Sequence, residues 1–165
     1  METYKLTEIN ECEISIGPCP KGGDHLERSM GELRDCGTTM IISLLTYPES
    51  LQLGLSSEAD VSKTHSIEFI DFPIMDKGIC GFDQFVEFIE FVYRKTNEFE
   101  SILIHCQHGV GRSGMVALGL MIRDGKELEE SIMSVSKTRG YDVPQSLAQR
   151  KLLSAFNLYI LNKFH

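Results

Sequence analysis

Cys106 and Arg112, separated by five residues, are the pair whose types and spacing best suit chemistry. The residues between them are Gln107, His108, Gly109, Val110 and Gly111. A tight turn with two glycines lets successive backbone N–H groups point inward at one anion. An arginine adds a planar fork that can bridge two oxygens of a phosphate monoester. The segment therefore predicts a phosphate cradle, formed by residues 107–112, around a cysteine thiol.

Cys106 is the predicted nucleophile of this cradle. The amides, the N-terminus of a following helix and Arg112 surround the thiol with positive charge, which favours the thiolate, the nucleophilic form. Ser113 is placed to donate a hydrogen bond to the sulfur and to help it leave when a phosphoenzyme breaks down. His105 is expected to order the loop through hydrogen bonds, because a thiolate needs no general base.

Release of a phosphate also requires a proton for the departing oxygen, so an acid must reach over the loop from elsewhere. Asp76 is the preferred candidate, since it lies just past an expected strand and close to Gly78, where a mobile loop could carry it over a bound substrate. Asp71 is the alternative. Its place at the strand end before a proline indicates a turn role instead.

Short apolar runs alternate with longer helical patterns along the chain, which is typical of βαβ units. Strands are expected at residues 14–16, 39–45, 67–70 and 101–104. Helices are expected over residues 24–36, from Pro48, and over residues 82–93, 113–122, 128–135 and 146–161. We therefore expect an α/β fold over residues 1–165: a single-domain three-layer sandwich with a central, mostly parallel sheet of four to five strands flanked by helices.

The composition is that of an ordinary globular protein, with 42% hydrophobic and 24% charged residues. A net charge of −8 disfavours nucleic acid as a partner. The first residues lack the pattern of a secretory signal, and no run approaches the ~18 apolar residues of a membrane-spanning helix. We expect a cytoplasmic protein. The five cysteines include no close pair, so neither a disulfide framework, a metal site nor a cofactor is indicated.

At the cradle the chain resembles the protein tyrosine phosphatase superfamily, in its small dual-specificity branch, whose signature is His-Cys, five residues and Arg-Ser or Arg-Thr. Further landmarks resemble the group of cyclin-dependent kinase inhibitor 3 type phosphatases: residues 22–26, 43–46 with Glu49, and 72–74 with Asp76. The resemblance implies Cys106 as nucleophile, Arg112 with the amides of 107–112 as phosphate cradle, and Asp76 as general acid. It implies a phosphoprotein or phosphopeptide as substrate.

The same resemblance places a glutamine-containing segment, residues 143–149, near the loop, so that Gln145 or Gln149 would help to place the hydrolytic water. The competing interpretation is a helix cap at Ser146 with two solvated glutamines. Cys80 is a departure, because related sequences often have proline there. It permits a disulfide with Cys106 under oxidation, although an uninvolved thiol is the preferred interpretation.

Three other functions are compatible with a cysteine in an anion loop. A phosphopeptide-binding pseudophosphatase would keep the cradle without turnover. A phosphoinositide phosphatase would use the same chemistry, but lipid phosphatases commonly carry lysines in the loop, and this loop has none. Arsenate reductases need resolving cysteines for a thiol relay. Rhodaneses, which transfer sulfur, would have no use for Asp76. The sequence therefore favours a cysteine-dependent phosphoprotein phosphatase that hydrolyses phosphotyrosine, with phosphoserine and phosphothreonine as further substrates.

Overall fold

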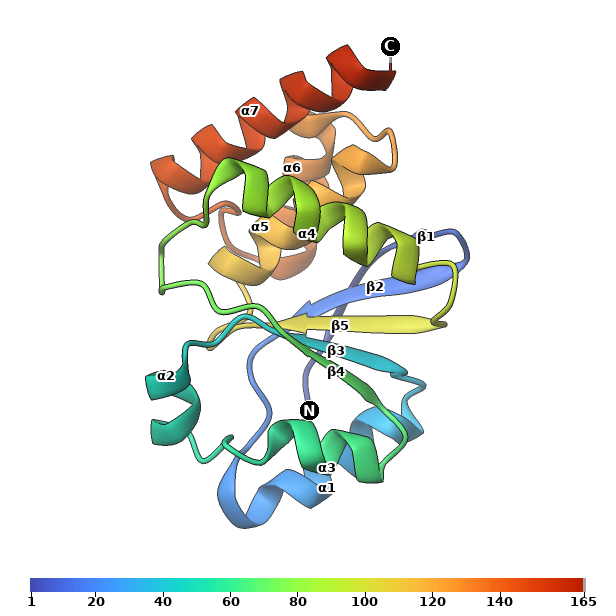
Figure 1. Ribbon diagram of the computed structural model, residues 1–165, viewed down its shortest axis with the longest axis vertical. Coiled ribbons are helices and arrows are strands. Elements are labelled where there is room, and N and C mark those ends of the chain that lie inside the picture. Colours follow the sequence, from blue (N-terminus) through green and yellow to red (C-terminus); the bar gives the residue numbers. More distant parts are fainter. Residues whose placement is uncertain (165) are drawn as a thin grey trace.

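Five strands form one mixed sheet at the centre of the molecule (Figure 1), in the order β1-β2-β5-β3-β4. The computed structural model describes residues 1–164. The strands are β1 (Tyr4–Ile9), β2 (Cys12–Gly17), β3 (Met40–Ser43), β4 (Glu68–Asp71) and β5 (Ser101–His105). Strands β2, β5, β3 and β4 are parallel, and β1 pairs with β2 in the antiparallel sense. The predicted α/β sandwich with a mostly parallel sheet is confirmed.

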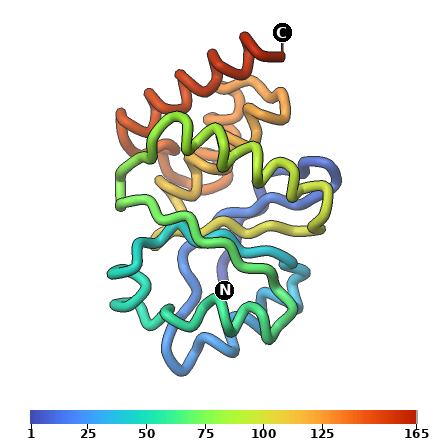
Figure 2. The backbone as a smooth tube through the Cα atoms, viewed as in Figure 1, coloured from blue at the N-terminus to red at the C-terminus, as the bar shows by residue number. Residues whose placement is uncertain are grey.

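Helices cover both faces of the sheet. They are α1 (Leu26–Asp35), preceded by the 3-10 turn η1 (Gly23–His25), and α2 (Tyr47–Gln52), α3 (Glu58–Thr64), α4 (Phe82–Lys95), α5 (Gly111–Arg123), α6 (Leu128–Arg139) and α7 (Leu147–Phe164). Helices α1 and α3 lie on one face, and α4 to α7 lie on the other (Figures 1 and 2). No helix in residues 1–164 is long and apolar enough to cross a membrane.

Strand β3 shows why the central strands are apolar throughout. All four of its residues are buried, because a parallel strand is covered by helices on both faces. Met40 and Ile42 pack into the large core under α4 and α5. Ile41 points the other way and packs with Met30 of α1 in a second, smaller core. The strand period of two thus divides the apolar residues between two layers.

Two elements were not predicted from the sequence, β1 and α3. The turn between β1 and β2 uses Asn10 and Glu11, whose φ angles are 52° and 67°, without the glycine that usually marks such a hairpin. Helix α3 is short and begins with Glu58, a charged residue that is nevertheless only 2% exposed. Its burial has no local sequence signal, because the partner of Glu58 lies far along the chain.

The carboxyl ends of the parallel strands meet at one edge of the sheet. Gly17, His105, Ser43 and Asp71 lie in register across β2, β5, β3 and β4. The segments that follow these residues are therefore brought together at this edge, where ligands bind in open α/β sheets. The three groups of landmark residues, 22–26, 43–46 with Glu49 and 72–74 with Asp76, lie at or after these strand ends. The sheet therefore brings them to the same edge.

Candidate active site

The predicted cradle, residues 107–112, spans the loop after Cys106 and the first two residues of α5. Cys106 is 3% exposed. The backbone N–H of Gly109 donates to the Cys106 sulfur at 3.3 Å. The hydroxyl oxygen of Ser113, on the first turn of α5, lies 3.4 Å from the same sulfur. The structure thus brings Cys106, Gly109 and Ser113 together, and both neighbouring groups can donate hydrogen bonds to a thiolate.

Two glycines give the loop its shape. Gly109 has a φ of 71°, and a Cβ there would lie 2.2 Å from the carbonyl carbon of Gly17. The loop is therefore pressed against the backbone that follows β2, and the N–H of Cys19 donates to the carbonyl of Gln107 at 3.2 Å. A Cβ on Gly111 would lie 2.2 Å from the side-chain oxygen of Gln145. The chain can approach this closely only where no side chain intervenes.

Arg112 is 2% exposed and is held by a carboxylate from α2. Its Nη1 and Nη2 donate to the two carboxylate oxygens of Glu49 at 2.8 and 2.9 Å, and Nη1 also donates to the carbonyl of Ile74 at 2.8 Å. The hydrogen bonds from Arg112 lower the pKa of Glu49 to about 2, so Glu49 is ionised at neutral pH. The sequence interpretation named Glu49 only as a landmark and missed this pairing.

The Nε of Arg112 is the one buried side-chain nitrogen or oxygen in the described residues that has no hydrogen-bond partner. Buried donors of this kind are rare in proteins and need an explanation. Glu49 accepts one hydrogen bond from each terminal nitrogen, and the carbonyl of Ile74 accepts a second one from Nη1. Nε and the second N–H of Nη2, which lies 3.5 Å from Asp76, are therefore the donors left for a ligand. An oxyanion bound in the loop could accept their hydrogens.

Asp76 lies in the segment between β4 and α4, with a carboxylate oxygen 3.5 Å from Nη2 of Arg112. Its side chain is 50% exposed. Asp71, the alternative candidate, ends β4. Burial and the charge of Glu58 raise the pKa of Asp71, while His105 opposes the shift. Of the two aspartates, Asp76 is thus the one in contact with the arginine of the cradle.

His105 is fully buried beneath the loop. Its Nε2 lies 2.7 Å from a carboxylate oxygen of Glu58, and its Nδ1 lies 3.2 Å from the carbonyl oxygen of Cys106. The ring is therefore fixed between α3 and the residue that carries the thiol. Glu58 is not predictable from the sequence, because nothing in its local pattern separates it from a solvated helix residue.

The two glutamines differ in their surroundings. Gln149 is fully buried, and its side-chain nitrogen donates to the carbonyl of Gly78 at 3.3 Å in the segment that carries Asp76. Its side-chain oxygen accepts from the N–H of Gln145 at 3.1 Å. The N–H of Gln149 also donates to the hydroxyl of Ser146 at 3.2 Å, which is the expected helix cap. The cap interpretation thus holds for Ser146, but Gln149 is not solvated, whereas Gln145 is exposed.

Cys80 is a free thiol, as are the other four cysteines. It is half-buried and packs against the larger core. Burial raises the pKa of its thiol, which lowers its reactivity at neutral pH. No group of His, Cys, Asp or Glu side chains within residues 1–164 is arranged to hold a metal ion.

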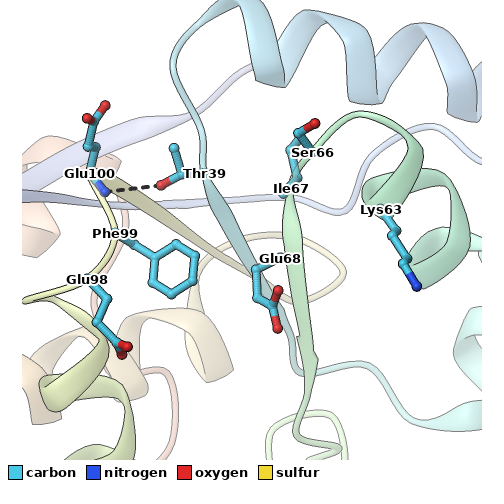
Figure 3. A pocket seen from close by; sticks show the side chains of 8 residues that line it. All are labelled: Thr39, Lys63, Ser66, Ile67, Glu68, Glu98, Phe99 and Glu100. Carbon is cyan, nitrogen blue, oxygen red and sulfur yellow. Dashed lines mark hydrogen bonds between the residues drawn. The ribbon is translucent and has the colours of Figure 1, made fainter.

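Another hollow of the molecule, of about 490 Å³, lies at the opposite edge of the sheet (Figure 3). It is lined by the starts of β3 and β4 and by the segment before β5, where the N–H of Glu100 donates to the hydroxyl of Thr39 at 3.2 Å. Glu68, Glu98 and Glu100 border it. Lys63 is the one cation of the lining, so three carboxylates outnumber it and the net charge of the hollow disfavours a phosphate dianion.

The family described as "Dual specificity phosphatase, catalytic domain" matches residues 39–157. Human cyclin-dependent kinase inhibitor 3 is 27% identical over 160 residues, which cover 92% of this chain and 75% of the human protein. A crystal structure of kinase associated phosphatase with serine in place of its catalytic cysteine has a TM-score of 0.84 and 22% identity, covering 98% of this chain and 96% of that one. PTPMT1 in complex with PI(5)P has a TM-score of 0.77 and 17% identity, covering 96% of this chain and 98% of that one.

The two structural neighbours share the fold, and the family match covers most of the chain. The strand, the loop and the helix around Cys106 are those of a cysteine-based phosphatase. The chain belongs to the dual specificity phosphatase family and is a protein phosphatase, a phosphoric monoester hydrolase. Within that family it resembles cyclin-dependent kinase inhibitor 3.

Proposed function

We propose that this protein hydrolyses phosphotyrosine in phosphoproteins, with phosphoserine and phosphothreonine as further substrates, through a cysteinyl-phosphate intermediate. The observation that carries the proposal is the contact between Asp76 and Arg112 beside a sulfur that already accepts from the Gly109 amide. Nucleophile, phosphate donors and acid thus belong to one site. We also propose that residues 1–165 act as one domain in the cytoplasm.

In the first step the Cys106 thiolate attacks phosphorus, so that an S–P bond forms and the bond from phosphorus to the leaving oxygen breaks. The amides of residues 107–112 and the free Nε of Arg112 hold the phosphate oxygens. Asp76 gives its proton to the leaving oxygen, which departs as a hydroxyl. Glu49 keeps the arginine in place during this step, since it accepts one hydrogen bond from each terminal nitrogen.

In the second step water attacks the phosphocysteine, and the sulfur leaves as a thiolate. The Asp76 carboxylate accepts a proton from the water. Ser113 donates to the departing sulfur, 3.4 Å away. Gln145 is suited to place the water, because its side-chain oxygen lies beside Gly111 at the mouth of the loop. Gln149 supports the same step indirectly, since it ties Gly78 to the start of α7.

A polypeptide suits the rim of this site better than an inositol headgroup. The loop contributes no lysine to meet extra phosphates. Tyr47, Met75 and Leu147 are 74%, 70% and 70% exposed. Tyr47 and Met75 lie within two residues of Glu49 and Ile74, which accept hydrogen bonds from Arg112. Leu147 lies two residues before Gln149, which donates to Gly78 in the segment that carries Asp76. Exposed apolar side chains gathered near one site are typical of interaction surfaces, and these three flank segments that hold the cradle.

Phosphate release from p-nitrophenyl phosphate, from phosphotyrosine, phosphoserine and phosphothreonine peptides and from a phosphoinositide panel tests the proposal. We expect turnover of the aryl phosphate and the peptides, and none with Cys106→Ser, which should still bind phosphopeptide. Tight phosphopeptide binding without release by the native chain would identify a pseudophosphatase. Faster release from phosphoinositides than from every peptide would identify a lipid phosphatase.

A further inference from the structure

Arg139, the last residue of α6, contacts the outer side of the cysteine loop. Its Nε donates to the carbonyl of Gly109 at 2.7 Å, and its Nη2 donates to the carbonyl of His108 at 3.1 Å. The role of Arg139 has no local sequence signal. Arg139 lies 30 residues after Gly109 in the chain, so only the packing of α6 brings it to the loop.

The two hydrogen bonds decide the direction of the peptide groups. In a planar trans peptide, the C=O and the N–H point in opposite directions. The carbonyl of His108 points outward to Arg139, and the N–H of the same peptide, on Gly109, points inward to the Cys106 sulfur at 3.3 Å. The carbonyl of Gly109 also points outward, so the N–H of Val110 is turned away from Arg139 in the same way.

The guanidinium is itself held by aromatic rings. Its carbon lies 4.1 Å from the ring centroid of Tyr4 and 5.1 Å from that of Tyr141. Stacking of this kind leaves the edge of the guanidinium, where its N–H groups lie, free to donate. Tyr4 belongs to β1, the edge strand, and its hydroxyl donates to Glu2 at 2.7 Å. The edge strand thus takes part in ordering the site without touching it.

We propose that Arg139 is a positioning residue that turns the amides of Gly109 and Val110 toward the bound phosphate. This inference rests on the proposed phosphate cradle and adds a residue that never touches substrate. Without Arg139, the two peptide groups lose their outer hydrogen bonds and can rotate. The cradle then has to be ordered by the anion itself, at a cost in affinity.

Arg123 provides a matched control. It also stacks over two rings, with its guanidinium carbon 4.2 Å from the centroid of Tyr93 and 4.4 Å from that of Phe164. It pairs with Glu90. Arg123 ends α5, whereas the loop precedes the start of this helix. Replacing Arg123 with alanine removes the same kind of stacking interaction but no hydrogen bond to a loop carbonyl.

The experiment measures tungstate binding by isothermal titration calorimetry and kcat/KM on p-nitrophenyl phosphate for the native chain, Arg139→Ala, Arg139→Lys and Arg123→Ala. Circular dichroism and thermal melting establish that each variant folds. We expect Arg139→Ala to weaken tungstate binding and to lower kcat/KM by about 10- to 100-fold. Arg139→Lys should recover only part of both, because one ammonium lacks the planar fork. Arg123→Ala should match the native chain in both.

Native-like tungstate affinity in Arg139→Lys or in Arg139→Ala would overturn the inference, and so would an equal loss in Arg123→Ala. The lysine variant decides the question even where the alanine variant does not fold. Tungstate binding needs no turnover. Suppose that the native chain binds tungstate, that Arg139→Ala weakens this binding, and that the native chain releases no phosphate. This result would contradict the proposed function and leave the inference about Arg139 standing.

Discussion

Two carboxylates face Arg112 from different environments, and we propose different roles for them. Glu49 accepts two hydrogen bonds from Arg112 and two from Thr46, is 18% exposed, and has its pKa lowered to about 2. It remains ionised and cannot supply a proton near neutral pH. Asp76 makes one contact at 3.5 Å and is half exposed. Pairs of acids in unlike environments are how active sites separate a fixed charge from a proton donor.

Replacing Asp76 with asparagine tests the residue that we propose as acid. We expect kcat on a phosphothreonine peptide to fall by roughly 10²- to 10⁴-fold, because an alkoxide needs a proton to leave. The effect on p-nitrophenyl phosphate should be smaller, since nitrophenolate leaves unaided. Asp71→Asn is the control, and a larger loss there than in Asp76→Asn would transfer the role to Asp71.

At the scale of elements, the site depends on how closely the β5–α5 loop approaches the chain after β2. Gly109 makes this approach possible for two reasons. Its φ is 71°, and backbone atoms of Gly17 lie where the Cβ of any other residue would be. The loop shape therefore comes from two strand ends held in register, Gly17 beside His105. Neither strand end alone determines the shape.

Gly109→Ala should lower stability by about 2 kcal/mol or more, because strain at positive φ is added to a backbone clash. We expect kcat/KM per folded molecule to fall as well, since the Gly109 amide must move away from the sulfur. Gly37→Ala is the matched control: its φ is 98°, but nothing lies within 4 Å of its Cβ position. Urea denaturation and steady-state kinetics measure both. Full activity in Gly109→Ala would show that the approach to Gly17 is not required.

At the scale of the whole molecule, side-chain pairs that join distant segments surround the edge where the strands end. Glu49 of α2 reaches Arg112 of α5 across this edge. Glu58 of α3 reaches His105 of β5. Each pair is buried or nearly so, and breaking a buried pair by removing one partner is costly. We therefore expect the loss of either pair to lower both stability and catalysis.

The Glu49 pair predicts a pH dependence of stability. The pKa of Glu49 is lowered from 4.5 to about 2 in the folded chain. Its contribution is therefore complete above about pH 4.5 and is lost as the pH falls toward 2. At pH 7 we expect the native chain to be more stable than Glu49→Gln by about 1–3 kcal/mol. The gap should narrow below pH 4.5 in urea titrations, and a gap that stays constant from pH 7 to pH 3 would contradict the assignment.

The sequence by itself determined the chemistry of the loop. The spacing of Cys106 and Arg112, the glycines between them and the order of strand, loop and helix are local, and this pattern is enough to predict an anion-binding loop of backbone amides. Most strands and helices also followed from apolar periodicity. The hairpin at Asn10 and Glu11 did not, because its turn lacks the usual glycine.

The tertiary structure alone decided which distant groups hold that loop in place. Glu49, Glu58 and Arg139 carry no local pattern that separates them from solvated surface charges, and Gln149 was equally ambiguous. Their partners lie on other elements, so the contacts exist only once the helices pack over the edge of the sheet. A short sequence motif can define a reactive group, but the burial and pairing of charges around it depend on the whole fold.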